Sequence, residues 1–384
     1  MPGSSIRYIG VNDHEIDLFE GQYEVPAGMS YNSWVILDDK VCVTDTVDRA
    51  FSEEYLDKLD KALEGRSPDY LVVHHVEPDH ASSLQAFLDR HPDVILVGNA
   101  KTFQMLENYF LLEGTQRLTV KEGDTLPLGA HTLRFITAPM VHWPEVMMSY
   151  EESEQILFSA DAFGQFGALD EAPEWDADEA RRYYFNIVGK YGPQVQAVLK
   201  KAAGLAIREV LPLHGPVLDA QTLPAVLEKY GIWSSYGVED EGVLIAYASL
   251  HGNTAAAAER LADILDGKGC PDIMLADLNR VDPAEALAYA FRYGKVVLCA
   301  STYNAGVMPY MEDFIHHLKA KNWQKRTVGL MENGSWAPMA AKVVRELLAG
   351  QKDLTFLEPA VTIKGAPKTT DIPALESLAD ALMA

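Results

Sequence analysis

The stretch VLIAYASLHGNTAAAAERLADIL, residues 243–265, decides the fold of the second half of this chain. It begins with an unbroken run of aliphatic and aromatic residues, which is typical of a buried strand. A short polar loop follows, and an alanine-rich segment with helical spacing begins directly after it. Because a strand that passes straight into a helix is the unit of parallel α/β folds, this stretch predicts the first such unit.

The same order of strand and then helix recurs four more times up to residue 384. The later strands are expected at 272–278, 295–302, 326–333 and 355–363, and the helices at 282–291, 308–320, 337–349 and 371–383. Regular alternation of this kind predicts a doubly wound parallel sheet. Such a sheet binds its ligand at the carboxyl ends of its strands, so the loops after the strands are the candidate binding loops.

The first half has a mixed α/β pattern that is richer in strand. Apolar runs at 33–45, 69–76, 94–98, 132–139, 145–150 and 155–160 predict strands, and the spacing in 52–63 predicts a helix. The two halves also differ in charge, with a net −22 before Val243 and −2 from there onward. The polar stretch YGVEDEG at 236–242 marks the change, so we expect domains at 1–240 and 241–384.

The amino-acid composition excludes some classes of partner and of cysteine site. The 384 residues carry a formal charge of −24, whereas nucleic acids and anionic membranes attract basic proteins, so neither is expected as a partner. Three widely spaced cysteines, Cys42, Cys270 and Cys299, form neither a disulfide framework nor a Cys-x-x-Cys metal site. No signal-peptide pattern and no apolar run near 18 residues is present, so we expect a soluble cytoplasmic protein.

The loop after the strand at 243–249 is a candidate phosphate site. It offers hydroxyls, a glycine and backbone N–H groups at a helix N-terminus, from Ser249, His251, Gly252, Asn253 and Thr254. It lacks the lysine of nucleotide-hydrolysing P-loops and the G-x-G-x-x-G of dinucleotide folds, which favours a small terminal phosphate. The alternative for this loop alone is an ordinary helix cap.

Two later loops follow strands of the same predicted sheet. One contains Ser301, Thr302, Tyr303, Asn304, Ala305 and Gly306, and the other contains Asn333, Gly334, Ser335 and Trp336. Tyr303 and Trp336 suggest a sandwich around a flat heterocycle, although aromatic residues in loops also serve only to pack them. The three loops together resemble those of flavodoxin, and the ligand that this resemblance implies is FMN.

The first half contains a dense group of potential metal ligands. His75, Glu77, Asp79 and His80 lie within HVEPDH, directly after an expected strand. Further donors follow expected strands at His142, Asp161 and His214. Because seven donors exceed the needs of one ion, the set predicts two metals that share a carboxylate, for which Asp161 is the best candidate. His74 is expected to face away from His75, and His14, His91, His131, His316 and His317 have no donors nearby in sequence.

The pattern His-x-[His/Glu]-x-Asp-His, followed by distant His, Asp and His, resembles the metallo-β-lactamase fold. Zinc hydrolases of that fold have histidine at the second position, whereas this chain has Glu77, and the carboxylate favours iron over zinc. A β-lactamase-like diiron domain followed by a flavodoxin-like domain resembles the flavodiiron proteins, also called A-type flavoproteins. The resemblance implies an N-terminal αβ/βα sandwich followed by a C-terminal flavodoxin-like doubly wound parallel sheet.

The resemblance also implies roles for the residues. His75, Glu77 and His142 would bind one iron, Asp79, His80 and His214 the other, and Asp161 would bridge them. The 249–254 loop would hold the FMN phosphate, and the 301–306 and 333–336 loops would hold its ring. Without Cys-x-x-Cys pairs, the chain is expected to be a minimal two-domain member that lacks a rubredoxin tail.

The implied activity is the reduction of dioxygen to water, of nitric oxide to nitrous oxide, or both, with electrons passing from an external donor through FMN to a diiron site. The implied partners are rubredoxin or another small electron donor and a second copy of the chain, in a head-to-tail homodimer or a dimer of dimers. A zinc hydrolase of the same fold and a flavin-only electron carrier are the alternatives.

Overall fold

The computed structural model describes residues 5–384, which divide into two compact units, Met1–Tyr230 and Gly231–Ala384. The segment 231–240 packs with the second unit, because the guanidinium of Arg326 donates hydrogen bonds to the carbonyl oxygens of Tyr236 and Gly237 at 3.0 and 2.9 Å. The two units are described separately below. The domain boundary near residue 240 stays a prediction.

Two sheets form the centre of the first unit. One has the order β1-β6-β7-β8-β9-β10, with strands Ile6–Tyr8, Trp34–Ile36, Cys42–Thr44, Tyr70–Val72, Ile95–Gly98 and Gln116–Thr119. The other has the order β11-β12-β13-β14-β15, with strands Thr125–Pro127, Thr132–Thr137, Met147–Glu151, Ile156–Phe158 and Glu209–Leu211. Val72 and Val97 of the first sheet belong to the same buried cluster as Phe135 and Phe158 of the second, so the sheets pack face to face.

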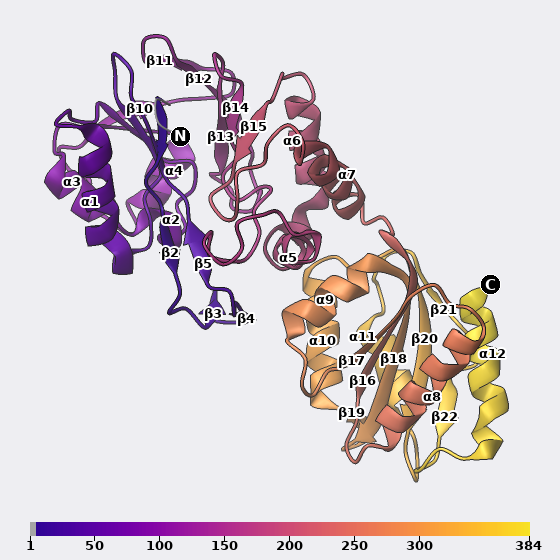
Figure 1. Cartoon of the computed structure of the whole chain (residues 1–384). Helices are drawn as coiled ribbons and strands as arrows, with labels where there is room; N and C mark the ends of the chain where they lie inside the picture. The colour runs from indigo at the N-terminus through magenta and orange to yellow at the C-terminus, as the bar shows by residue number, and fades with distance from the viewer. Residues whose placement is uncertain (1–4) are drawn as a thin grey trace. The chain divides into compact units, whose positions relative to one another are not determined.

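Helices cover the outer sides of this pair of sheets. In Figure 1, α1 and α3 lie beside the first sheet and α6 and α7 beside the second, which is the αβ/βα sandwich expected from the sequence. The helices are α1 Ser52–Leu63, α2 Pro78–Ala81, α3 Leu84–Arg90, α4 Ala100–Leu106, α5 Ala177–Tyr183, α6 Gly192–Ala202 and α7 Leu223–Ser234. Two short pairs complete the unit, β2 Val11–Asp13 with β5 Met29–Tyr31 and β3 Leu18–Phe19 with β4 Tyr23–Glu24.

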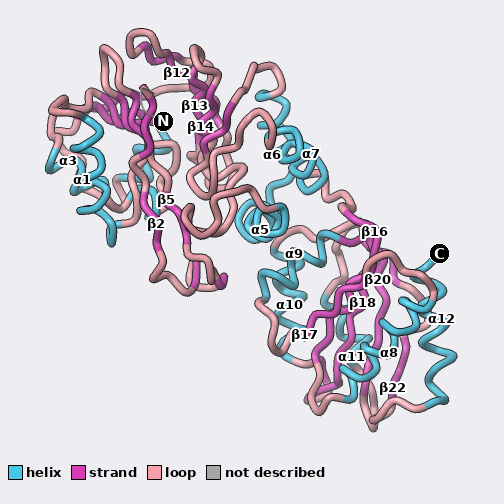
Figure 2. Tube along the Cα trace, in the orientation of Figure 1, coloured by secondary structure: helices cyan, strands magenta, loops and turns pink. Residues whose placement is uncertain are grey.

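The second unit is a parallel sheet between helices (Figure 2). Its strand order is β17-β16-β18-β20-β21, the flavodoxin order, with strands Ile273–Asp277, Asp240–Ala248, Tyr293–Tyr303, Arg326–Asn333 and Leu354–Phe356. All these neighbours pair in parallel, and β19 Gly306–Val307 adds an antiparallel edge to β18. The helices are α8 Asn253–Gly267, α9 Pro283–Arg292, α10 Pro309–Ala320, α11 Ala340–Leu347 and α12 Ile372–Met383.

One core lies between this sheet and helices α8 and α12. It contains Ile245, Val297 and Met331 from the strands and Leu261 and Leu378 from the helices. The sequence predicted a single strand over 355–363, and that prediction is wrong. The segment forms two short strands, β21 and β22 Val361–Ile363, which both pair with β20. Pro359 lies between them and has no N–H to donate, so it cannot continue the ladder.

Among residues 5–384 no helix is both long and apolar enough to cross a membrane.

Candidate metal centre and flavin pocket

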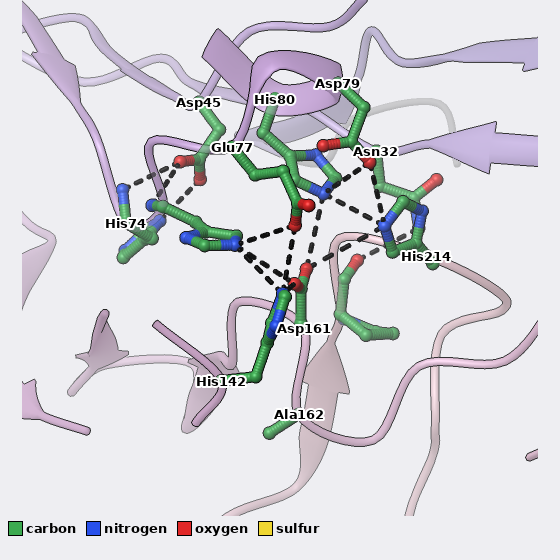
Figure 3. A network of polar contacts seen from close by, with 12 residues as sticks. Asn32, Asp45, His74, Glu77, Asp79, His80, His142, Asp161, Ala162 and His214 are labelled. Carbon is green, nitrogen blue, oxygen red and sulfur yellow. Dashed lines mark hydrogen bonds and ion pairs between the residues drawn. The ribbon is translucent and has the colours of Figure 1, made fainter. Parts of the chain in front are cut away.

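The seven predicted metal ligands form two groups in the first unit, and Figure 3 shows the network of polar contacts around Asp161. His75 and Glu77 lie in the loop after β8, and Pro78 begins the short helix α2 that carries Asp79 and His80. The other three donors follow β12, β14 and β15, as His142, Asp161 and His214 respectively. They form two groups in which the ligand atoms all lie within 4.8 Å of one another: His75, Glu77, His142 and Asp161, and Asp79, His80 and His214.

Asp161 stands between the two groups. Its Oδ2 lies 3.3 Å from His75 Nε2 and 3.0 Å from His142 Nε2. Its Oδ1 lies 3.3 Å from His80 Nε2 and 3.8 Å from His214 Nε2. Neither oxygen has a hydrogen-bond partner, although the side chain is fully buried. One carboxylate thus turns one oxygen to each group.

Each group also has a carboxylate of its own. Glu77 Oε2 lies 3.2 Å from His75 Nε2 and 3.0 Å from His142 Nε2. Asp79 Oδ2 lies 3.3 Å from the Nε2 atoms of both His80 and His214. The mixed nitrogen and oxygen donor set in each group is typical of transition-metal sites.

Contacts behind the rings orient two of the histidines. His214 Nδ1 lies 2.7 Å from the carbonyl oxygen of Ser30, and His75 Nδ1 lies 2.8 Å from Glu145 Oε1. Because a carbonyl oxygen only accepts, Nδ1 of His214 carries the hydrogen and Nε2 keeps its lone pair toward the centre. The contact with Glu145 selects the same tautomer of His75. Metal-binding histidines are commonly held in this way.

Acidic and basic side chains lie close together at this centre and shift one another's pKa values. Burial raises the pKa of Asp161 and Glu77, but the neighbouring histidines outweigh it and hold both pKa values well below the usual range. Burial lowers the pKa of His142, but the nearby carboxylates of Asp161 and Glu77 outweigh it and raise that pKa to about 9. The pKa of His75 is raised well above its ordinary value for the same reason, chiefly by the charge of Asp161.

The centre fits a pair of metal ions. The Nε2 atoms of His75 and His142 approach to 3.3 Å, and those of His80 and His214 to 3.0 Å, so potential ligand atoms converge in each group. Both oxygens of Asp79 and of Asp161 are buried without a hydrogen bond. Unpaired buried carboxylate oxygens are costly, and cations bound among them would remove that cost.

His74 and His131 lie outside both ligand groups, although each of them contacts a carboxylate. His74 bonds Asp45 Oδ2 through Nδ1 at 2.6 Å and Ser149 Oγ through Nε2 at 2.8 Å, and it belongs to neither group. His131, which has no donors nearby in sequence, lies with its ring 2.7 Å from Asp38 Oδ2 and 3.3 Å from Glu154 Oε1, and it also belongs to neither group. Asp38 lies between β6 and β7 and Glu154 lies between β13 and β14, so folding brings both carboxylates to this ring.

The second unit has a cavity of about 450 Å³ formed by the three predicted loops. Predicted residues that line it are His251, Asn253, Thr254, Ser301, Thr302, Asn304, Ala305, Asn333, Gly334, Ser335 and Trp336. Ser249, Gly252, Tyr303 and Gly306 do not line it. Ser249 Oγ instead accepts a hydrogen bond from Ala255 N at 3.3 Å, in the first turn of the helix whose N-cap residue is Gly252.

The cavity suits a flat, uncharged ring with a small phosphate. None of its lining residues is Asp, Glu, Lys or Arg, and the indole of Trp336 is 83% exposed at its rim. Asn253 and Thr254 begin helix α8, whose first N–H groups are free of helix bonds and favour an anion. Gly252 precedes them with φ +82°, a left-handed conformation that glycine adopts without strain.

Sequence reasoning missed several residues of both sites. In the flavin pocket these are Leu250, Ala337, Met339 and Gly365, which lie beside predicted positions in the chain or on a further loop. At the metal centre they are Glu145 and Tyr183. Tyr183 is fully buried, its hydroxyl has no hydrogen-bond partner, and burial followed by the charge of Asp161 raises its pKa. It is the last residue of α5, directly before a π-helical turn.

Comparison with known proteins agrees with this architecture. The family described as ODP family beta lactamase matches residues 29–215, and the flavodoxin domain family matches residues 244–365. A nitric oxide reductase of Moorella thermoacetica is 30% identical over 377 residues, which cover 96% of this chain and 94% of that protein. A rubredoxin-oxygen oxidoreductase of Megalodesulfovibrio gigas is 28% identical over 386 residues, covering 97% and 94%.

Solved structures agree as well. Rubredoxin oxygen:oxidoreductase from Desulfovibrio gigas matches with a TM-score of 0.92 at 27% identity, covering 99% of this chain and 97% of that one. The flavodiiron protein from Giardia intestinalis matches with a TM-score of 0.92 at 26% identity, covering 99% and 95%.

Fold and site together define a class of protein in which a β-lactamase-like domain with a dinuclear ligand set and a flavodoxin domain occupy one chain. The coverage of the relatives extends over both domains. This chain belongs to the flavodiiron protein family. The resemblance inferred from the sequence and the predicted fold class are both confirmed.

Proposed function

We propose that this chain is a reductase that takes electrons from an external donor through FMN to a diiron site and there reduces dioxygen, nitric oxide or both. Dioxygen takes up four electrons and four protons to give two waters. Two nitric oxide molecules take up two electrons and two protons to give nitrous oxide and water. The observation that carries the proposal is the pair of ligand groups that face the two oxygens of Asp161, in a chain that also has a flavodoxin domain.

The first ion would be held by His75, Glu77 and His142, the second by Asp79, His80 and His214, and Asp161 would contact both. Two adjacent irons supply stored electrons and open positions where one diatomic molecule, or two, can be held. The carboxylates of Glu77, Asp79 and Asp161 offset the positive charge of the ions. The hydrogen bonds behind His75 and His214 keep the Nε2 lone pairs aimed at the centre.

Residues around the centre control access and protons. The side chains of His75, His80, Asp161 and His214 are all buried, which limits bulk water at the site. The hydroxyl of Tyr183 lies close enough to Asp161, Asp79 and Glu77 for their charges to raise its pKa. It therefore stays protonated, and its hydroxyl hydrogen would be available for a hydrogen bond to a bound molecule.

The flavin would occupy the cavity of the second unit. The N–H groups at the start of α8 and the hydroxyl of Thr254 would bind the phosphate, and the loops 301–306 and 333–336 would hold the ring. When bound there, FMN would supply both one-electron and two-electron transfer. Ser249, Tyr303 and Gly306 have a supporting place in this proposal, because they shape the loops rather than line the cavity.

The partners follow from the same reasoning. An external donor is needed, and rubredoxin is favoured because the names of two relatives couple the enzyme to it. We also propose a head-to-tail homodimer, or a dimer of such dimers, in which the flavin of one copy serves the irons of the other.

A zinc hydrolase is the second candidate, because the first unit shares its fold with zinc hydrolases. Glu77 argues against it, since a carboxylate in place of imidazole hardens the site. The flavodoxin domain also has no use in hydrolysis. A flavin-only electron carrier leaves the seven converging ligands without a purpose.

The test combines metal analysis with one substitution. Protein purified without oxygen from iron-supplemented cells is expected to contain two irons and one FMN per chain and to consume dioxygen or nitric oxide. His142→Ala is expected to lose the ion held by His75, Glu77 and His142, and with it gas consumption, but to keep FMN. His316→Ala, an exposed histidine far from both ligand groups in sequence, is the control and is expected to behave like the wild type.

Other outcomes point elsewhere. Zinc at full occupancy despite supplied iron would identify the hydrolase. Flavin without metal would leave the electron carrier. Gas consumption that survives His142→Ala would overturn the assignment of the metal centre.

A further inference from the structure

The two ligand groups differ in what lies behind their histidines. In one group, His75 Nδ1 contacts the carboxylate of Glu145 at 2.8 Å. In the other, His214 Nδ1 contacts the neutral carbonyl of Ser30 at 2.7 Å, and His80 Nδ1 is buried with no hydrogen-bond partner. A carboxylate thus lies behind His75 in the first group. In the second group, the acceptor behind His214 is neutral and His80 Nδ1 has no acceptor.

Glu145 is built into this position. Its side chain is 0% exposed. Its Oε1 also accepts a hydrogen bond from Val76 N at 3.0 Å, so it holds the backbone next to His75 as well as the ring. Its own backbone carbonyl accepts a hydrogen bond from Asn99 Nδ2 at 2.5 Å, and Asn99 in turn caps helix α4. The loop that delivers His142 therefore also delivers Glu145 in a fixed place.

The second carboxylate oxygen of Glu145 adds to the argument. Glu145 Oε2 is buried and has no hydrogen-bond partner. A buried carboxylate with one unpaired oxygen is costly unless a positive charge lies nearby. A cation held by His75 on the other side of the imidazole would compensate this charge. The carboxylate and the metal position therefore stabilise each other through the imidazole.

The two ligand groups have different numbers of carboxylates near them. The group of His75 has Glu77, one oxygen of Asp161 and, one step behind, Glu145. The group of His214 has Asp79 and the other oxygen of Asp161. Negative charge near an iron strengthens its binding and favours the ferric over the ferrous state. We infer that Glu145 is a positioning residue that makes the two metal positions unequal, so that the ion held by His75 binds more tightly and is oxidised more easily.

This inference rests on the proposed diiron site, and its experiment separates the two. Metal-free protein is loaded with ferrous iron without oxygen, and a coloured ferrous chelator is then titrated in. The wild type is expected to release its two ions in two separate steps. Glu145→Gln keeps an acceptor oxygen but removes the charge, and it is expected to weaken one ion by about 10–100-fold, the usual effect of losing a partner behind a metal ligand.

Double variants locate the affected ion. In His214→Ala the ion that remains is the one held by His75, and adding Glu145→Gln is expected to weaken it. In His142→Ala the better-preserved position is that of His214, and adding Glu145→Gln is expected to change its affinity little. Potentiometric titration followed by electron paramagnetic resonance is expected to show a more positive potential for one iron in Glu145→Gln.

Glu151→Gln is the matched control. Glu151 is equally buried, lies at the end of β13 and bonds Ser153 and Glu154, but it belongs to neither ligand group. It is expected to lower the stability of the protein without changing either iron affinity. Wild-type ions that leave together, an equal loss of both ions in Glu145→Gln, or the same loss in Glu151→Gln would overturn the inference. A wild type that binds no pair of irons would overturn the proposed function itself.

Discussion

Gly252 holds the turn into helix α8 with φ +82°, and an added Cβ would meet no atom within 4 Å. Gly252→Ala is therefore expected to act through backbone strain alone, about 1–2 kcal/mol, because alanine resists the left-handed region. If the loop relaxes, its N–H groups move away from the phosphate, and FMN is expected to bind roughly 5–30-fold more weakly. Fluorescence titration of flavin-free protein measures this.

Two further variants check the reason. Gly252→Asn is expected to restore most of the affinity, since asparagine tolerates the left-handed region. Gly267→Ala is the control, because Gly267 also has open space around it but not a positive φ. If Gly252→Asn binds FMN as poorly as Gly252→Ala, backbone strain is not the cause.

His131 gives the first unit a pH-dependent contact. Burial lowers its pKa, but hydrogen bonds to Asp38 and Glu154 outweigh burial and raise it above the ordinary value. A raised folded-state pKa contributes stability that is fully present below the unfolded pKa, about 6.5, and is lost as pH rises through the folded value. The free energy of unfolding of the wild type is expected to exceed that of His131→Gln by about 1–3 kcal/mol at pH 6, and by less as pH rises.

Urea unfolding of both proteins between pH 6 and 9 measures that difference. The pKa of Asp38 is lowered, so Asp38 stays ionised across this range and adds no slope. The comparison of two variants also removes the titration of the metal centre. A difference that is constant with pH would show that His131 acts as a neutral packing residue.

At the scale of elements, the end of strand β5 holds the loop that carries His214. Asn32 Nδ2 donates to the carbonyl oxygens of Pro212 and Gly215 at 2.9 and 2.8 Å. Ser30 accepts from His214 Nδ1 through its carbonyl and from Gly215 N through its hydroxyl. A strand from the beginning of the chain thus fixes a ligand that lies far along the sequence.

Asn32→Ala is expected to leave two buried carbonyl oxygens unpaired and to lower the free energy of unfolding by about 2–4 kcal/mol. Because the loop that carries His214 loosens, the variant is also expected to lose one of its two irons preferentially. Metal analysis and chemical unfolding measure both effects. Asn12→Ala, which removes only the acceptor for Leu169 N, is the control and should retain both irons. Full iron content in Asn32→Ala would show that Ser30 and the backbone bonds of Leu213 hold the loop without the Asn32 side chain.

At the scale of the whole molecule, the proposed head-to-tail dimer makes a prediction about mixed dimers. One chain carries His142→Ala and retains flavin, and the other carries a flavin-loop variant and retains iron. Co-expressed with two tags and purified as a mixed dimer, the pair is expected to recover gas reduction, because one intact flavin then faces one intact diiron site. Each variant alone is expected to be inactive. A mixed dimer that stays inactive would show that electrons pass within one chain.

The charge of −24 belongs to this scale too. It is concentrated in the first domain, and only a few of its carboxylates are consumed at the metal centre. The remainder keeps the protein soluble and repels acidic partners. A small acidic donor such as rubredoxin is therefore expected to approach the nearly neutral second domain, and its reaction rate should depend only weakly on salt concentration.

Much of the fold follows from local patterns. The alternation of apolar runs and helical spacing after Val243 repeats often enough that only a doubly wound sheet accommodates it. The seven metal ligands could be chosen because each follows an expected strand, and strand ends meet along one edge of a sheet. The family resemblance then assigned them to two ions, and these assignments and the individual flavin contacts remain predictions.

Other features depend on side chains that only folding brings together. Glu145 and Tyr183 belong to no sequence motif. They were identified by their surroundings, because Glu145 contacts the ring of His75 and Tyr183 lies near the carboxylates of the metal centre. The contacts of His131 with two carboxylates and the hydrogen bond that Ser249 accepts from Ala255 N also form only in the folded chain. Periodicity and spacing are properties of neighbours in the chain, so the sequence by itself determined most of the strands and helices, and it predicted the seven ligands. Contacts between residues far apart depend on how the sheets and loops pack, and only the tertiary structure decided them.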